Sequence, residues 1–583
     1  MTVLEALLVA LLLLCGTGTV QAAPKTAAPN ILLIVADDLG YSDLGAFGSE
    51  IPTPNLDRLA AGGVRLTGFY TSPFCAPTRA MLLSGVDNHR AGFGDQVELM
   101  LPEQKGKPGY EGFLNERVAP LPRVLRDAGY RTLMAGKWHL GNRESEGPHQ
   151  RGFDRSYALA SGGSSHWGDQ LGIVATERGK APMAMFREDG RPIRIPQDFY
   201  SSEVFARKII EYIDEGRGSG KPFFAYLAFT APHWPLHARD EDIRRFEGVY
   251  DGGYDALRAR RLAGLEAQGI IAGDATVYTG HAAWPKWDTL DDDLKRAESK
   301  RMAVYAAMVH AMDREIGRVL DYLKAQGELD NTFVFFMSDN GADGNSILDV
   351  AHDREWIHSS MNNGIANTGR IGSFVEYGPG WAQVSETPLR MYKSFTYEGG
   401  ISAPAIAWGP GLGVGGGIRH SLVHVMDVAP TLYEIGRARY PGAVRGRTAL
   451  LPLQGKSMLA YLQGRQERVH GPEEAVGWEL GGRKALRKGD WKIVSSNQPW
   501  GTGTWELYDM ARDRAETQDL AAAMPGKVAE LVESWQQYVT TNGVLDIPGL
   551  SDRPGYSNST GYYDDLRFDV RHAEDDRTES RWR

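Results

Sequence analysis

Short apolar runs alternate with helical segments along most of this 583-residue chain. Five of these runs have the length and the β-branched or aromatic content of buried parallel strands. Because strands and helices alternate, we expect an α/β domain in which helices sandwich a large mixed, mostly parallel sheet. The predicted strands are Ile31–Val35, Tyr130–Ala135, Phe223–Phe229, Phe333–Met337 and Ala405–Trp408.

Three of the intervening segments have clear helical signals. The first begins at Pro54, directly after the potential N-cap Thr53, and ends at a Gly-Gly pair. The other two, Ser201–Glu215 and Arg301–Gln326, are longer, and the second carries one continuous apolar stripe. An apolar stripe of this kind predicts a helix that packs against the sheet.

Four of the predicted strands run directly into a cluster of polar residues. Asp37-Asp38 comes after the first strand, and Ser338-Asp339-Asn340-Gly341 after the fourth. The second and third strands lead into Gly136-Lys137-Trp138-His139 and Ala231-Pro232-His233. Ligands of open α/β sheets bind beyond the carboxyl ends of the strands. We therefore expect these clusters, which lie far apart in the sequence, to converge on one site.

Hard oxygen ligands dominate two of these clusters. Asp37, Asp38 and Asp339 supply three carboxylates, and Asn340 supplies an amide oxygen. This set suits one hard divalent cation, and we expect Ca²⁺ in preference to Mg²⁺. Zinc is a poor match because it favours nitrogen and sulfur ligands. The alternative is that the acidic residues only cap strand ends in solvent.

The first 22 residues read as a secretory signal peptide. Leu7–Leu14 is apolar but too short to span a bilayer, and Val20-Gln21-Ala22 resembles a small-x-small cleavage site. No later segment has the length and apolarity of a membrane helix. We therefore expect a periplasmic or secreted protein without a membrane span; a lipid anchor at Cys15 is the alternative.

Composition divides the rest of the chain into three parts. The first is the large α/β domain, which holds all four polar clusters and is therefore the one expected to carry the site. The second is a smaller α+β domain, with antiparallel strands at Lys484–Val494 and Thr504–Leu507 and one amphipathic helix. The third is charged and poor in aliphatic residues, which predicts a loosely held tail. The boundaries are 29–460, 465–545 and 546–583.

The formal charge of −10 limits the partners of the chain. A net negative protein is a poor match for nucleic acid, so we expect no nucleic-acid partner. The same charge disfavours general attraction to polyanionic glycans. A local basic pocket for a single sulfate is compatible with it.

Only Cys75 would remain after export, because the other cysteine, Cys15, lies in the leader. A lone thiol has no intramolecular disulfide partner, so the side chain of Cys75 either packs in the protein interior or takes part in a reaction. The run Cys75-Ala76-Pro77-Thr78-Arg79, followed by Ser84-Gly85, resembles the signature of the sulfatase family. In that family the cysteine is oxidised to formylglycine. The alternative is a buried cysteine that acts as a small hydrophobe.

Other segments extend the resemblance over most of residues 29–545. Tyr377-Gly378-Pro379-Gly380-Trp381-Ala382 and Ala485–Lys492 are similar to bacterial arylsulfatases in particular. The resemblance implies an alkaline-phosphatase-like fold with a smaller C-terminal α+β domain. It also implies a maturase, of the formylglycine-generating or radical type, that converts Cys75 to 3-oxoalanine.

The resemblance further implies how the modified side chain works. Hydration of the aldehyde gives a geminal diol, one hydroxyl of which attacks sulfur and forms a sulfate ester. Loss of a proton from the second hydroxyl then releases sulfate and restores the aldehyde. The modified Cys75 would join Asp37, Asp38, Asp339 and Asn340 around the metal.

Five further residues receive catalytic roles from the same resemblance. Arg79, one helical turn after Cys75, would offset the carboxylates. Alternation on an extended segment would place Lys137 and His139 on one side, where both touch the diol and His139 is the base. His233 would protonate the leaving oxygen, and Lys393 would grip sulfate and the bridging oxygen.

Two of these assignments have close rivals in the sequence. His237 lies four residues after His233, and Arg390 lies three residues before Lys393. Taken singly, any of these side chains could instead be a surface charge or a hydrogen-bonded structural histidine. Their order along the chain favours the assigned set.

We therefore predict an exported arylsulfatase-type hydrolase that converts sulfate monoesters into an alcohol or phenol plus sulfate. One alternative is a phosphate or phosphonate ester hydrolase with the same site. Another is a non-catalytic anion-binding protein in which Cys75 stays a thiol. The segment Ala342–Thr387 has little periodicity, and we expect it to form a substrate rim with His166-Trp167.

Overall fold

The computed structural model describes residues 28–174, 180–346, 354–412, 415, 417–442, 450–552 and 561–572. The predicted signal peptide at residues 1–22 and its alternative anchor at Cys15 lie outside these ranges. Within them, no helix is long and apolar enough to cross a membrane.

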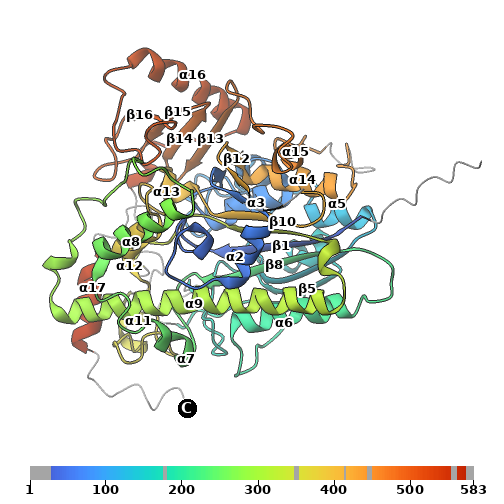
Figure 1. The fold of residues 1–583 in the computed structure, drawn as a ribbon, viewed down its shortest axis with the longest axis horizontal. Coiled ribbons are helices and arrows are strands. Elements are labelled where there is room, and N and C mark those ends of the chain that lie inside the picture. Colours follow the sequence, from blue (N-terminus) through green and yellow to red (C-terminus); the bar gives the residue numbers. More distant parts are fainter. Residues whose placement is uncertain are drawn as a thin grey trace, which may run out of the picture.

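A ten-stranded mixed sheet forms the centre of the molecule (Figure 1). Strand β1 (Asn30–Asp37) lies between β8 (Phe223–Pro232) and β9 (Thr332–Ser338) and is parallel to both. Strand β4 (Arg131–Lys137) continues the parallel part beside β8, and β10 (Ala405–Trp408) is antiparallel to β9. All five predicted strands are confirmed.

The remaining strands of this sheet are short and lie toward its two edges. The order across the sheet is β11-β2-β10-β9-β1-β8-β4-β5-β6-β7. The edge strands are β11 (Gly417–Arg419), β2 (Val64–Leu66), β5 (Arg155–Leu159), β6 (Phe186–Glu188) and β7 (Arg191–Pro192).

Helices cover both faces of the sheet, which explains why the interiors of its central strands are mostly apolar. On β1, Leu32, Ile34 and Ala36 belong to one hydrophobic core cluster, and Ile31 and Leu33 belong to the cluster on the other face. Helices α2 (Pro54–Gly62), α6 (Ser201–Asp214) and α9 (Asp292–Ala325) cover the first face (Figure 1). Helices α3 (Cys75–Ser84), α5 (Leu121–Asp127) and α14 (Val428–Ile435) cover the second.

The C-terminal part contains a second sheet of four antiparallel strands. These strands are β13 (Ala475–Leu480), β14 (Arg483–Lys488), β15 (Trp491–Ser495) and β16 (Trp505–Asp509), and α16 (Pro525–Asn542) packs on them. The predicted α+β subdomain is therefore present. A turn at Gly489-Asp490 divides the predicted strand Lys484–Val494 into two, and β13 was not predicted.

Three local predictions from the sequence were wrong. Helix α9 begins at Asp292, nine residues before the predicted start, because Asp291 caps it by accepting from the Leu294 N–H. The predicted loop 342–387 contains α11 (Arg354–Ser360) and α12 (Gly378–Ser385), and every residue of α12 is buried. The predicted loose tail contains α17 (Tyr562–His572).

Helix α17 packs against α9 through polar as well as apolar contacts. Leu566 is fully buried, and Tyr562 contacts Glu298 on α9 by a hydrogen bond. Arg301 Nη2 of α9 lies 2.8 Å from Asp569 Oδ2. The low aliphatic content of this segment led to the prediction of a loose tail. Composition does not show which residues elsewhere in the chain the segment contacts, so the prediction failed.

A buried ionic cluster joins the large domain to the C-terminal subdomain. His89 Nδ1 lies 3.0 Å from Asp87 Oδ1, and its Nε2 lies 3.1 Å from Glu479 Oε2 on β13. The Tyr538 hydroxyl of α16 donates to Asp87 Oδ2 at 2.9 Å. Burial opposes the charged imidazole, but these two carboxylates outweigh it and raise the pKa of His89 to about 9.

This shift predicts a loss of stability at alkaline pH. A raised folded-state pKa gives a stabilisation that is complete below the unfolded value near 6.5 and disappears as pH rises through about 9. Its size is on the order of 3 kcal/mol. Thermal unfolding midpoints of wild type and His89→Gln, compared between pH 6 and pH 10, should therefore converge as pH rises. The exposed His572→Gln should behave as wild type, and a constant difference for His89→Gln would contradict the assignment.

Candidate active site

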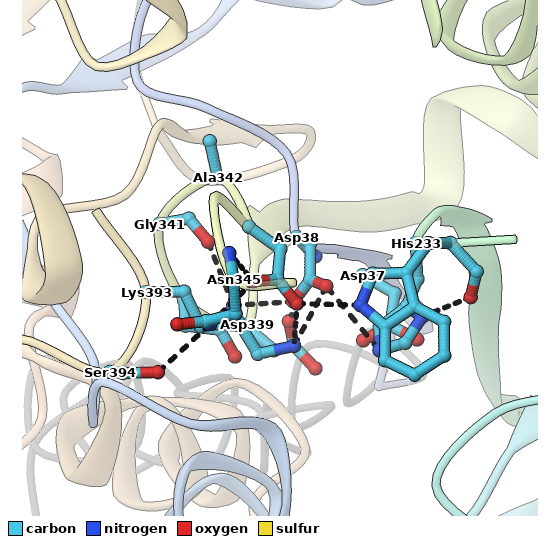
Figure 2. Close-up of polar contacts among 12 residues, drawn as sticks. Asp37, Asp38, His233, Asp339, Gly341, Ala342, Asn345, Lys393 and Ser394 are labelled. Carbon is cyan, nitrogen blue, oxygen red and sulfur yellow. Dashed lines mark hydrogen bonds and ion pairs between the residues drawn. The ribbon is translucent and has the colours of Figure 1, made fainter. Parts of the chain in front are cut away.

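The carboxyl ends of β1 and β9 bring the predicted acidic residues together, because these two strands are neighbours. Asp37, Asp38, Asp339 and Asn340 are all buried, with exposed fractions of 0 or 1 %. Asp38 adopts a left-handed backbone (φ 66°), and its N–H donates to Asp339 Oδ1 at 3.3 Å. Figure 2 shows the three carboxylates between Lys393 and His233.

Cys75 completes this cluster from the first turn of α3. Ligand atoms of Asp37, Cys75 and Asp339 all lie within 4.8 Å of one another, and so do those of Asp38, Cys75 and His233. Phe74 gives the helix no side-chain cap, so backbone N–H groups at this end stay available to an anion. Burial raises the pKa of the Cys75 thiol to about 12, which disfavours a thiolate.

The oxygen donors fit a hard cation. Asn340 Nδ2 donates to Asp38 Oδ1 at 2.6 Å and to the Gly341 carbonyl at 2.9 Å. Its Oδ1 is buried and has no hydrogen-bond partner within the described ranges. A buried acceptor of this kind, beside three carboxylates, is what calcium or magnesium would bind.

Burial also makes the carboxylates depend on nearby positive charge. It raises the pKa of Asp37 to about 6, and it raises that of Asp38 well above the ordinary value. Asp339 is equally buried, but the Arg79 guanidinium keeps its pKa below the ordinary value. Positive charge at this site therefore decides whether the carboxylates are ionised.

Three basic side chains from distant segments supply part of that charge. Arg79 Nε donates to Asp339 Oδ2 at 2.8 Å, and Lys137 Nζ donates to Asp37 Oδ2 at 2.7 Å. Lys393 Nζ donates to Asp38 Oδ2 at 2.8 Å. Arg79 lies one turn after Cys75 on α3, as the sequence predicts, and its side chain is fully buried.

A fourth carboxylate, Asp343, was not predicted. Its Oδ2 accepts from Lys393 Nζ at 3.0 Å and from Trp234 Nε1 at 2.9 Å. When all of them are ionised, the four carboxylates and three basic groups together carry one negative charge. A divalent cation would reverse that sign, and the site would then attract an anion.

The two predicted histidines differ in their contacts. His233 Nε2 lies 3.4 Å from Asp38 Oδ2, while its Nδ1–H donates to the Trp234 carbonyl at 2.5 Å. His139 follows the end of β4 in a left-handed conformation (φ 55°), so the expected strand alternation with Lys137 does not extend to it. Its Nε2 faces Glu98 Oε1 at 3.2 Å.

Comparison with known proteins agrees with this arrangement. The family model described as Sulfatase matches residues 29–436. The chain belongs to the sulfatase family. It is 41% identical over 440 residues to an arylsulfatase of Klebsiella aerogenes, and the aligned region covers 75% of this chain and 93% of the relative. An uncharacterized sulfatase of Schizosaccharomyces pombe is 43% identical over 534 residues, with 90% and 96% covered.

Solved sulfatases share the fold. The crystal structure of Ps i-CgsB in complex with k-i-k-neocarrahexaose matches with a TM-score of 0.62 and 25% identity, covering 93% of this chain and 97% of that one. Together with the arylsulfatase relative, this identifies the chain as a sulfuric ester hydrolase.

The two rival residues lie away from the carboxylates of this sulfatase. His237 Nε2 donates to the Ser373 carbonyl at 2.9 Å. Arg390 packs over the Tyr397 ring and lies 3.4 Å from Glu506 Oε2 of the C-terminal sheet. His166, predicted on the substrate rim, is buried behind the catalytic candidates and donates from Nε2 to the His233 carbonyl at 2.9 Å.

The double contact of Asp343 predicts a positioning effect on the hydrolysis reaction. Asp343→Asn should let Lys393 move, because one of its two carboxylate partners is lost, and should lower kcat/KM for an aryl sulfate about 10-fold or more. Asn345→Ser removes a hydrogen bond to the other Asp343 oxygen and should cost less. Unchanged kcat/KM in Asp343→Asn would mean that Asp38 alone positions Lys393.

Proposed function

We propose that this sulfatase hydrolyses aryl-type sulfate monoesters through the aldehyde form of Cys75. One observation carries the proposal: Cys75 begins a buried helix and lies among Asp37, Asp38 and Asp339, with Lys137 and Lys393 bound to two of these carboxylates. A nucleophile at this position would have cationic groups on the side where a sulfate oxygen binds.

The proposal includes one divalent cation, held by Asp37, Asp38, Asp339 and Asn340. Calcium is favoured over magnesium because four protein oxygens, without a required octahedral water shell, suit its flexible coordination. When bound, the cation would supply positive charge to the sulfate and to an oxygen on residue 75. The unpaired Asn340 Oδ1 supports this assignment.

In the proposed chemistry, the maturase-generated aldehyde of residue 75 is hydrated to a geminal diol. One diol hydroxyl passes its proton to a neighbouring carboxylate and its oxygen attacks sulfur. The bond from sulfur to the bridging oxygen breaks, and that oxygen keeps the electron pair and takes up a proton to leave as the alcohol or phenol. His233 would protonate the leaving oxygen from Nε2, and Lys393 would stabilise its charge, since both contact Asp38 on that side of the cluster. Arg79 and Lys137 would hold the diol and its carboxylates.

An apolar cluster beside His233 supports a substrate with an apolar leaving group. The Trp234 and His233 rings are 4.8 Å apart, and Trp234 packs in a cluster with Leu171, Ile173 and Phe374. The cluster also contains Ile357 and Met361, with the partly buried Val174 and Trp356 at its edge. The arylsulfatase relative agrees with this proposal.

The alternative of phosphate ester hydrolysis uses the same groups. Rates on matched aryl sulfate and aryl phosphate substrates separate the two functions. The non-catalytic alternative requires a thiol at residue 75, and the mass of the peptide that contains Cys75 decides it. Export to the periplasm or beyond remains part of the proposal on the strength of residues 1–22.

The oxygen ligand set predicts that activity depends on calcium. Chelation should abolish aryl sulfate hydrolysis, calcium should restore it best, and zinc should not. Asn340→Ala should need a higher calcium concentration both for activity and for the rise in thermal unfolding midpoint that ligand binding produces. Full activity after complete metal removal would contradict the metal assignment.

The diol mechanism predicts a single turnover for Cys75→Ser. Its hydroxyl should attack sulfur once, and the sulfated serine should then persist because it has no second hydroxyl through which to collapse. Quenched-flow assays should show at most one phenol per enzyme, with one sulfate on the peptide of residue 75. Cys75→Ala should give neither phenol nor adduct. Multiple turnovers by Cys75→Ser would refute the aldehyde mechanism.

A further inference from the structure

Glu98 lies against His139, although no motif in the sequence points to it. The Glu98 side chain is 17 % exposed and the His139 side chain 4 %, and Glu98 Oε1 lies 3.2 Å from His139 Nε2. Glu98 Oε2 accepts from Gln96 Nε2 at 2.8 Å, so both carboxylate oxygens are engaged. Little water competes for this contact, which strengthens it.

This contact determines which nitrogen of His139 carries the proton. An ionised carboxylate only accepts hydrogen bonds, so Nε2–H is the donor to Glu98. The Gln96 amide nitrogen, 3.3 Å from the same Nε2, is also a donor and would favour the opposite tautomer. The ionised carboxylate at 3.2 Å is the stronger partner, because charge-assisted hydrogen bonds exceed neutral ones. In the neutral ring, Nδ1 therefore carries the lone pair.

The His139 Nδ1 atom is buried and has no hydrogen-bond partner among the residues that the structure describes. Burial lowers the pKa of His139 below its ordinary value, although Glu98 acts in the opposite direction, so the resting ring is neutral. A neutral, buried imidazole with an unused lone pair is suited to accept a proton during a reaction.

The backbone around His139 holds the ring in this orientation. His139 itself has a left-handed backbone conformation, which few residues other than glycine adopt unless the surroundings require it. Gly162 lies against the ring: a Cβ at this position would be 2.8 Å from both Cε1 and Nε2 of His139. The next residue, Gly163, lies near His233 instead, with a Cβ position 3.5 Å from its Cε1.

We propose that Glu98 is a positioning residue that keeps His139 in the Nε2–H tautomer, so that Nδ1 is the base for sulfate release. This role rests on the proposed function of residue 75. Nδ1 takes the proton of the free hydroxyl on the sulfated side chain. The O–H electron pair forms the C=O bond, and the C–O bond to sulfate breaks, its electron pair leaving with sulfate. Glu98 then stabilises the imidazolium, as a buried carboxylate does in serine hydrolases.

Glu98→Gln tests this proposal because the amide has the same shape but can donate to Nε2, which reverses the tautomer. Steady-state kcat for an aryl sulfate should fall by about 10²–10⁴-fold. The first turnover should remain fast, since attack on sulfur does not use Nδ1. The variant should therefore release a burst of one phenol per active site and accumulate sulfate on the peptide of residue 75.

Three control variants separate this role from a structural one. Glu98→Asp retains the charge and should recover part of kcat, without full accumulation of the adduct. Glu103→Gln changes an exposed glutamate of the same segment and should behave as wild type. Gly162→Ala should displace the His139 ring and show the same burst as Glu98→Gln, whereas Gly163→Ala should not.

The outcomes distinguish the two levels of the hypothesis. Wild-type protein that is active with an unmodified thiol would refute the proposed function itself. The role of Glu98 alone would be refuted if the wild type carries the aldehyde and Glu98→Gln either keeps normal kcat or slows without accumulating an adduct. An unchanged calcium-dependent unfolding midpoint of Glu98→Gln would show that the variant is folded.

Discussion

The pairing of buried carboxylates with buried cations is the interaction on which the site depends. Asp37 and Asp339 have fully buried side chains, and each contacts a cation whose side chain is also buried, Lys137 or Arg79. Removal of one partner from such a pair leaves an uncompensated charge and costs about 3–5 kcal/mol. The segments that carry these residues therefore stabilise one another, and the reactive groups belong to the core of the large domain.

The sequence predicts the parts of this arrangement that depend on short-range patterns. Apolar runs identify the central strands because helices on both faces bury the side chains of residues 31–36 in the interior of β1. Polar residues directly after such runs lie at one edge of the sheet, which places Asp37 and Asp339 together. Arg79 follows Cys75 by one helical turn, so its position on α3 was also predictable.

Residues held by tertiary contacts alone were not predictable. Glu98 follows no strand and has no distinctive neighbours, and only the folded chain places it against His139. Asp343 could have been noticed, since it lies three residues after Asn340, but its contact with Lys393 depends on a chain separation of 50 residues. Helix α17 was missed for the same reason, because it is held by contacts with α9, which lies far from it in the sequence.

The burial of Cys75 sets a time limit on its modification. Its exposed fraction is only 2 % in the folded protein, so the proposed maturase must act on the nascent chain before the pocket closes. Closure requires Asp339, which is synthesised 260 residues after its partner Arg79. At about 5–20 residues per second, translation leaves roughly 13–50 s for that enzyme to work. The proposed maturase therefore has this interval of synthesis in which to reach the thiol before Asp339 can bind Arg79.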